Sequence, residues 1–279
     1  MPRVLRRAFS SLIYIPLILY TIFAAGPFIW TLMMSFRNTP EIYANPYGFP
    51  NPIRFQNYID VWTKYGYATY FQNSIVVTVT AVVLGTMAGS MAAFVLARSR
   101  YAFPYRDIVY LLIFISIMFP PQITLLALFQ QLVNYGLYNS LIGLILVYAA
   151  SELPITVYLL RSFFIQIPRD IEDAARVDGA GDFRIFWQVM FPIAKPAIAA
   201  VIVLNFIGHW NEFLYALVFI NKQELRTLPL AVMFFMGENF QDISMLATGM
   251  IVAIAPVLII FIFFSETLIK GMTAGAVKG

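Results

Sequence analysis

Six apolar runs, each long enough to cross a lipid bilayer as a helix, dominate this sequence. The hydrocarbon core of a bilayer is about 30 Å thick and a helix rises about 1.5 Å per residue, so one crossing needs about 20 apolar residues. Because lipid offers no hydrogen bonds to the backbone, such runs are expected to be helical. The sequence therefore predicts an all-α integral membrane protein with six transmembrane helices, at residues 12–30, 74–97, 108–133, 141–160, 198–220 and 246–269.

The composition excludes an ordinary soluble domain. Only 11% of the 279 residues are charged and 61% are hydrophobic, whereas soluble domains carry about 25% charged residues. The net charge of +4 does not indicate a nucleic-acid-binding protein, because the basic residues are scattered between the apolar runs. No cysteine is present, which excludes disulfides, cysteine nucleophiles and cysteine metal ligands.

Prolines inside the third, fourth and sixth runs can bend the helices there. Pro120–Pro121 and Pro154 are predicted to break the third and fourth spans, and Pro256 lies in the sixth. Proline is tolerated within a span when neighbouring helices or water satisfy the freed carbonyl groups, so one interpretation is that these kinks line a cavity. The other interpretation is that they serve only the packing of the helices.

The loops between the runs indicate the orientation. With the N-terminus inside, the inner segments carry thirteen Lys and Arg residues and the outer segments carry five. Basic residues concentrate on the cytoplasmic side, so both termini are predicted to be cytoplasmic. A cleaved signal peptide is the alternative for the first run, but its apolar character continues to Met34, which favours a retained span. The outer segment 37–72 is expected to be ordered, with a short helix near Tyr58.

The sequence lacks common enzyme motifs. No Gly-Lys pair occurs, which excludes a Walker phosphate-binding loop. A single histidine excludes a two-histidine metal site, and no Gly-x-Ser-x-Gly nucleophile elbow occurs. We therefore predict that the chain is not an enzyme, with no catalytic residue, no metal site and no bound cofactor.

The segment between the fourth and fifth runs, residues 161–196, is unusually polar. Five acidic and three basic residues fall between Arg169 and Arg184. Acidic residues at its start favour a first short helix, and Gly179 and Gly181 are expected to end that helix.

A second short helix is predicted to follow. Asp182 is expected to cap it and Pro192 to end it. An apolar stripe is expected along it, at Phe183, Phe186, Trp187 and Met190. From these patterns alone, the loop is either a docking surface offered to the cytoplasm or an amphipathic linker on the membrane surface.

The loop resembles the EAA motif of the membrane subunits of binding-protein-dependent ABC importers. That motif reads Glu-Ala-Ala, three residues, Gly, nine residues, Ile-x-Leu-Pro. The chain has matching positions at Asp173, Ala174, Ala175, Gly179, Val189, Phe191 and Pro192. It departs from the pattern with Asp for Glu, Val for Ile and Phe for Leu. The WNEF stretch at 210–213 and the closing GMTAGAVKG resemble the carbohydrate-uptake branch, specifically its maltose-permease-like second subunit.

This resemblance implies one transmembrane permease domain over residues 1–279, of the type I importer kind, multi-pass in a prokaryotic plasma (inner) membrane. It implies a subunit of an ATP-driven sugar importer that forms half of the translocation pathway. The implied partners are a second homologous permease, two ATPase subunits that bind ATP and Mg, an extracytoplasmic sugar-binding protein, the sugar and membrane lipid. The implied ATPase-coupling residues are Glu172, Asp173, Ala174, Ala175, Asp178, Gly179, Ala180 and Pro192.

The fifth run carries a polar face. On a continuous helix, one side would hold Asn205, Gly208, His209, Glu212 and Tyr215. Polar groups within a span usually face a cavity or the bundle interior. One interpretation places Asn205, His209, Glu212 and Tyr215 on the solute pathway. The other makes them interhelical hydrogen-bonding partners of the second permease or of the fourth span near Glu152.

Other functions stay open on the sequence. Within the importer class, a polyamine or other cation could be attracted by Glu152 and Glu212, and a sugar phosphate is a further solute. An ion-coupled secondary carrier could use Glu152, Glu212 and Glu266 as a proton relay. A membrane-embedded enzyme acting on lipid is the last alternative.

Overall fold

The computed structural model describes residues 3–98, 101, 103–238 and 241–274. All regular secondary structure in these ranges is helical, which confirms the all-α prediction. Four helices in them are long and apolar enough to cross a membrane, and the number rises to six if each of two sharply bent helix pairs counts as one span. The cytoplasmic location of the termini and the count of six spans stay predictions, and residues 275–279 of the closing motif lie outside the described ranges.

The chain forms two compact units. The first contains Met1–Ala68 and Ala231–Ala255, and the second contains Thr69–Leu230 and Pro256–Gly279. The predicted single transmembrane domain stays a prediction.

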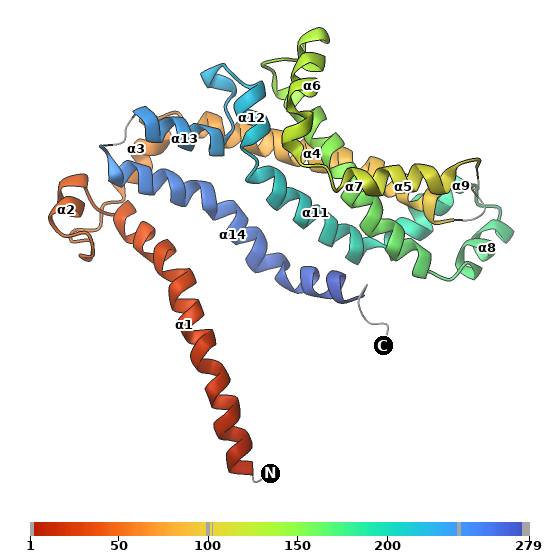
Figure 1. Cartoon of the computed structure of the whole chain (residues 1–279), viewed down its shortest axis with the longest axis horizontal. Helices are drawn as coiled ribbons and strands as arrows, with labels where there is room; N and C mark the ends of the chain where they lie inside the picture. The colour runs from red at the N-terminus through yellow and green to blue at the C-terminus, as the bar shows by residue number, and fades with distance from the viewer. Residues whose placement is uncertain (1–2, 99–100, 102, 239–240, 275–279) are drawn as a thin grey trace. The chain divides into compact units, whose positions relative to one another are not determined.

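The first unit contains α1 (Arg3–Ser35), α2 (Thr39–Ala44) and α3 (Gln56–Lys64), together with parts of α13 (Leu228–Glu238) and α14 (Ile243–Ala274) (Figure 1). Helix α1 extends the predicted first span in both directions, and α3 is the short helix expected near Tyr58. Helix α13 was not predicted, because its apolar stretch is too short for a span.

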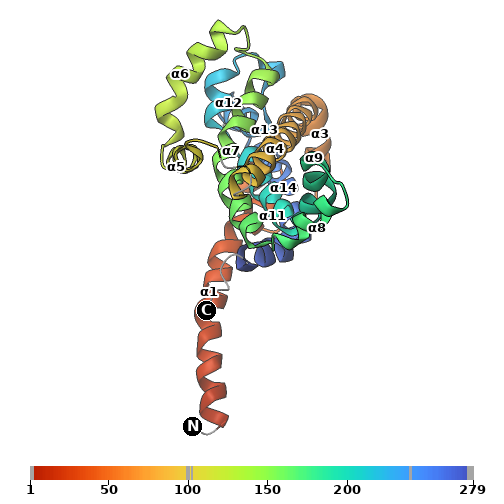
Figure 2. The same cartoon turned by 90° about the vertical axis from the view of Figure 1, so that its right-hand side faces the viewer.

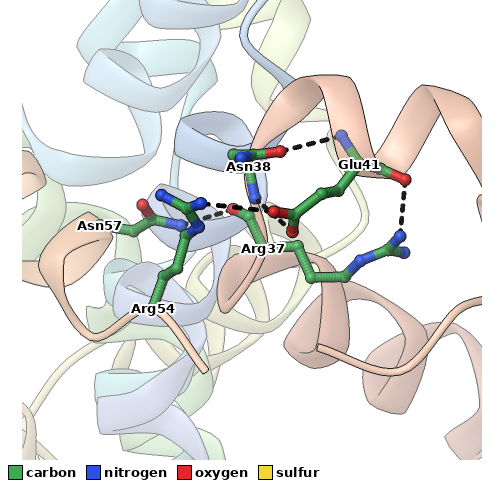
Figure 3. Close-up of polar contacts among 5 residues, drawn as sticks. All are labelled: Arg37, Asn38, Glu41, Arg54 and Asn57. Atoms are coloured by element: carbon green, nitrogen blue, oxygen red, sulfur yellow. Dashed lines mark hydrogen bonds and ion pairs between the residues drawn. The ribbon is translucent and has the colours of Figure 1, made fainter. Parts of the chain in front are cut away.

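Polar contacts order the loop between α1 and α3 (Figure 3). Asn38 caps α2 by accepting a hydrogen bond from the backbone N–H of Glu41, and the Glu41 carboxylate accepts one from the backbone N–H of Asn38. Arg54 pairs with the same carboxylate at 3.3 Å, and the buried Arg37 donates to the backbone carbonyl of Glu41 at 2.6 Å. Asn57 donates to the carbonyls of residues 35 and 37. The loop is therefore ordered by its own side chains, as the sequence predicted.

In the second unit, most of α4 (Tyr67–Ala97) lies with α5 (Arg106–Ser116), α6 (Pro121–Asn134), α7 (Leu141–Gln166), α11 (Lys195–Trp210) and α12 (Leu214–Phe219). Helix α7 packs on α11 and α5, and α12 packs on α6 and α7 (Figures 1 and 2). Two glycines of α4 permit its close approach to α7. A Cβ at Gly85 would overlap the Glu152 side chain, and one at Gly89 would overlap Thr156.

One of the two predicted proline breaks is present and the other is absent. The third span is broken as expected, since α5 and α6 meet at 103° across residues 117–120 (Figure 2). The break predicted at Pro154 is wrong, because α7 runs through it without interruption. A proline removes only one backbone hydrogen bond, that of the carbonyl four residues earlier. Ala150 and Pro154 both line a cavity at this point of the helix.

The continuous fifth span is also a wrong prediction. Helix α11 ends at Trp210, and α12 begins at Leu214. The Glu212 carboxylate accepts the backbone N–H groups of residues 215 and 216, so this side chain caps a new helix instead of continuing the old one. Helical spacing therefore does not place Glu212 and Tyr215 on the face that holds Asn205 and His209.

The 161–196 loop contains a first short helix, α8 (Asp170–Val177), which is followed by Gly179 in the left-handed region at φ +81°. Glycine adopts this conformation without a steric penalty, as the predicted helix end requires. The next helical stretch comprises α9 (Asp182–Ile185), a π-helix (Phe186–Met190) and α10 (Phe191–Ile193).

One prediction about this second stretch is wrong. Asp182 is its first helical residue and makes no capping hydrogen bond, because its carboxylate pairs with Arg176. The end predicted at Pro192 is confirmed to within one residue, because α10 ends at Ile193 and the chain then bends by 78° into α11. Along the predicted apolar stripe, Phe186 and Met190 are buried, while Phe183 is 71% exposed.

Candidate functional site

The motif-bearing loop has an outer face and an inner face. Asp173, Ala174, Asp178, Gly179 and Pro192 are exposed. Ala175 and Ala180 are partly buried against an apolar cluster, and Glu172 is buried at 6% exposure. The structure therefore divides the predicted ATPase-coupling residues between the two faces. Two exposed apolar side chains, Val177 and Phe183, add to the outer face.

An apolar cluster lies beneath the inner face and joins the loop to the ends of three long helices. Its buried members come from α4, from α7 and its C-cap, from α9 and the π-helix, and from the segment that starts α11: Ala93, Phe94, Leu160, Phe164, Ile167, Ile185, Phe186, Met190, Ala194, Ile198 and Val201. Burial of each large apolar side chain contributes about 1.5–3 kcal/mol relative to exposure. The loop is therefore folded onto the helix ends, as an amphipathic linker spread on the membrane would not be.

Arg98, directly after α4, is the polar centre of this inner face. Its side chain is 4% exposed and its Nε pairs with the Oε1 of Glu172 on α8. Its Nη1 donates to the carbonyl of Ile167 at 3.2 Å, and its Nη2 lies 3.9 Å from the sulfur of Met190. One guanidinium thus contacts the C-cap of α7, the short helix α8 and the π-helix.

Burial outweighs the attraction between Arg98 and Glu172. Desolvation lowers the pKa of the Arg98 guanidinium although Glu172 acts in the opposite direction. Desolvation likewise raises the pKa of the Glu172 carboxyl, against the opposing charges of Arg98 and Arg176. Each shift has the sign expected when the cost of removing a charge from water exceeds the attraction of its partner.

A second ion pair lies nearer to solvent. Arg176 Nη1 is 2.6 Å from Asp182 Oδ1, and its Nη2 donates to the Tyr101 hydroxyl at 3.0 Å. Although desolvation lowers the pKa of Arg176, the hydrogen bonds to Asp182 and Tyr101 raise it overall. Desolvation and the Asp182 carboxylate raise the pKa of Tyr101. This pair joins the end of α8 to the start of α9 across the glycine turn.

The polar residues predicted on the fifth span are placed in contact with the fourth. Asn205 donates to the Thr156 hydroxyl at 2.9 Å, and His209 Nε2 lies 2.6 Å from Glu152 Oε2. The His209 ring also stacks on Tyr148, with ring centroids 4.9 Å apart. These contacts are the interhelical hydrogen bonds of the second interpretation, and they lie inside the described unit.

Glu212 extends the same polar network. Its Oε2 accepts a hydrogen bond from the Tyr148 hydroxyl at 2.5 Å, and its Oε1 accepts one from the backbone N–H of Tyr215 at 2.7 Å. We call this set the membrane network: Tyr148, Glu152, Thr156, Asn205, His209 and Glu212.

A cavity of about 480 Å³ lies beside the network, at the bend between α5 and α6. Its wall includes Ser116, Thr124, Ser151 and Tyr215. Of the four predicted pathway residues, only Tyr215 lines it. The assignment of Asn205, His209, Glu212 and Tyr215 to a solute pathway stays a prediction.

Sequence reasoning missed Arg98 and Tyr148 as site residues. Arg98 contributed only to the count of basic residues in the loops, and Tyr148 looked like one of many aromatic residues in a span. A signal for Arg98 exists in hindsight, because an arginine directly after a span can reach acidic residues of another loop on the same side. Nothing in the sequence around Tyr148 indicates its partner.

The long apolar helices and the two sharply bent helix pairs give the described part of the chain the composition of a multi-pass membrane protein. The family model of the binding-protein-dependent transport system inner membrane component matches residues 85–272. The chain belongs to this family, and it is a permease component of an ABC transporter.

Relatives extend the match over almost the whole chain. The chain is 37% identical to the diacetylchitobiose uptake system permease protein NgcG of Streptomyces coelicolor, over 98% of this chain and 90% of the relative. It is 33% identical to the arabinooligosaccharides transport system permease protein AraQ of Halalkalibacterium halodurans, over 92% of each.

A solved structure shares the fold. A chain of a bacterial ABC transporter involved in the import of the acidic polysaccharide alginate superposes with a TM-score of 0.82 at 24% identity, covering 95% of this chain and 98% of that one. The same kind of transporter in complex with an alginate pentasaccharide-bound periplasmic protein gives a TM-score of 0.67 at 15% identity. The chain therefore has the type I ABC permease fold.

Proposed function

We propose that this permease serves an ATP-driven, binding-protein-dependent importer of a sugar, and that it forms half of the translocation pathway. The named relatives at 37% and 33% identity are permeases for oligosaccharides, which supports a sugar as the solute. The partners are a second homologous permease, two ATPase subunits and an extracytoplasmic sugar-binding protein. The chain spans a prokaryotic plasma membrane six times as one domain, with both termini in the cytoplasm.

One observation carries the coupling role: the motif-bearing loop is folded on one face and free on the other. Its inner face packs on the apolar cluster at the helix ends. Its outer face presents Asp173, Val177 and Phe183, of which Val177 is 89% exposed. Exposed apolar side chains rimmed by charge are typical of a surface that docks another protein. The occupant in this proposal is the ATPase subunit, which supplies the nucleotide site that this sequence lacks.

The solute path in this proposal passes the cavity at the bend of the third span, with Tyr215 in its wall. A volume of about 480 Å³ lies within the range of small-molecule sites. The carboxylates of Glu152 and Glu212 already have partners in His209 and Tyr148. They therefore give no support to the alternative of a polyamine or another cation.

Val177→Asp in the assembled transporter tests the coupling proposal. Val177 has little packing to lose, so membrane insertion and pairing with the second permease should stay normal. A charge in a docked apolar surface should cause loss of the ATPase subunits during purification, together with loss of uptake. Tyr47→Asp is the matched control, since Tyr47 is 81% exposed but lies in the other unit.

Equal ATPase retention and equal uptake in Val177→Asp and the control would contradict the docking role of the loop. Uptake that survives removal of ATP but collapses with a protonophore would instead support the ion-coupled carrier.

A further inference from the structure

The Arg98–Glu172 pair holds the loop to the helix ends at one buried point. We propose that Arg98 and Glu172 are positioning residues that make α8 move as one body with the ends of α4 and α7, so that displacement of the loop is transmitted to the spans. This inference rests on the proposed function, because it concerns how a docked loop would move the pathway.

The geometry of Arg98 supports this inference first. The residue follows α4 directly, so its backbone moves with that helix. Its side chain reaches the Ile167 carbonyl at the end of α7 and the Glu172 carboxylate on α8. The carbonyl of Arg98 in turn accepts a hydrogen bond from Arg106 at 3.3 Å, at the start of α5. Few side chains other than arginine have enough donors in a rigid plane to join so many elements.

The burial of the Arg98–Glu172 pair is a second argument for this positioning role. Both side chains are almost fully buried, at 4% and 8% exposure. A buried ion pair often contributes no more stability than a well-packed apolar pair of similar volume, because desolvation cancels the attraction. The surrounding cluster is already apolar, so methionine and leucine would suit the site. What an ion pair adds is a fixed direction of contact, which a packed apolar pair does not impose.

The neighbouring pair shows what a local contact looks like. Arg176 and Asp182 both lie within the loop, and Asp182 is 55% exposed. Exposed pairs contribute about 0–1 kcal/mol. Loss of that pair would loosen the glycine turn but would leave α8 attached to α4 and α7.

The experiment uses the complete transporter in liposomes, with binding protein and solute present, and measures ATP hydrolysed per solute imported. The test variants are Glu172→Gln and the double variant Arg98→Met with Glu172→Leu, and Asp182→Asn is the matched control. We expect both test variants to retain their ATPase subunits and to show a several-fold rise in ATP per solute. The control should keep the wild-type ratio.

The charge-swapped variant Arg98→Glu with Glu172→Arg adds a second measurement. It restores the ion pair but moves the guanidinium group away from the Ile167 carbonyl. We therefore expect the ratio of ATP hydrolysed per solute imported to return at most partly to the wild-type value.

The double apolar variant keeps the test decisive if Glu172→Gln fails to assemble, because it leaves no unpaired charge. A wild-type ratio in that double variant would overturn the inference and leave the pair a merely structural contact. That outcome differs from failure of the proposed function, in which even the wild-type complex would show no ATP-dependent uptake.

Discussion

The membrane network and the Arg98–Glu172 pair are two polar centres in one apolar chain, and they are built differently. The network uses separate contacts between neighbouring helices: Asn205 with Thr156, His209 with Glu152, and Tyr148 with Glu212. The pair at the loop uses one guanidinium that contacts several elements. In the network no side chain contacts more than two of the others, and Tyr148 and His209 each contact two. At the loop a single residue organises a whole inner face.

The two regions should respond differently to the loss of one contact. Loss of one contact in the network leaves the other contacts between the fourth and fifth spans in place. Loss of Arg98 would remove contacts to α8, to the C-cap of α7 and to the π-helix at once. The network therefore suits an interface that stays packed. The Arg98–Glu172 pair suits a contact that transmits displacement from one element to another.

Glu152→Ala should give the largest loss of stability in the network. The partly buried His209 would lose its partner at a cost of about 1–3 kcal/mol, and the vacated space beside Gly85 would add a cavity term. Thermal unfolding of the purified complex in detergent measures the loss. Glu152→Gln, which keeps an acceptor and the side-chain volume, should lose much less. Equal melting of the Ala variant and the wild type would mean that the Glu152–His209 contact does not hold the interface.

Gly85→Ala tests the same contact from the facing helix. The new Cβ would overlap the Glu152 side chain, and such overpacking costs about 1–3 kcal/mol. Gly208→Ala is the matched control, since open space surrounds that position. Combined with Glu152→Ala, the Gly85 substitution should cost clearly less than it does alone. Additive losses in the double variant would show that the two residues do not meet.

Tyr148→Phe should have a smaller effect. It removes the hydrogen bond to Glu212 but leaves the backbone N–H groups that the carboxylate accepts, so the expected cost is about 0.5–1.5 kcal/mol. Glu212 also holds the backbone of Tyr215, which lines the cavity. A shift of Glu212 should therefore move Tyr215 and change the uptake kinetics of the assembled transporter. Unchanged unfolding and unchanged uptake would mean that the Tyr148 hydroxyl is not needed, and that the backbone N–H groups of residues 215 and 216 are enough to hold Glu212 in place.

Asp182→Asn should have the smallest effect in this series. Its pair with Arg176 is partly exposed, so we expect a change of about 0–1 kcal/mol. The stabilities of the variant and the wild type should be compared at low and at high salt. Any difference between them should be smaller at high salt, because salt screens the exposed pair. A loss comparable with that of Glu152→Ala would erase the distinction between the loop surface and the network.

Several features of the fold were predictable because they depend on local chemistry. The apolar runs dictate helices, Pro120–Pro121 dictates the break between α5 and α6, and Gly179 supplies the left-handed turn after α8. The break in the fifth span was not predictable from hydropathy, since it depends on Glu212 capping α12 and on Tyr148 of another helix.

The candidate site was predictable only in part. The spacing of the motif located the loop, but which of its residues face inward depends on the core formed by α4, α7 and the π-helix. Ala175 and Ala180 face that core, while Ala174 is exposed, although all three are small residues of the same loop. The role of Arg98 depends on contacts across 69 and more residues of sequence, which no local pattern records.

The proline in α7 has a consequence for the wettability of the cavity. Pro154 has no N–H to offer the carbonyl of Ala150, and both residues line the wall. The hydroxyls of Ser116, Thr124 and Ser151 donate their protons to carbonyls of their own helices, so they face a guest mainly with lone pairs. The rest of the wall is largely apolar apart from Tyr215, whose hydroxyl can both donate and accept. Such a wall offers a polyol acceptors for its hydroxyl protons beside apolar area for its carbon atoms.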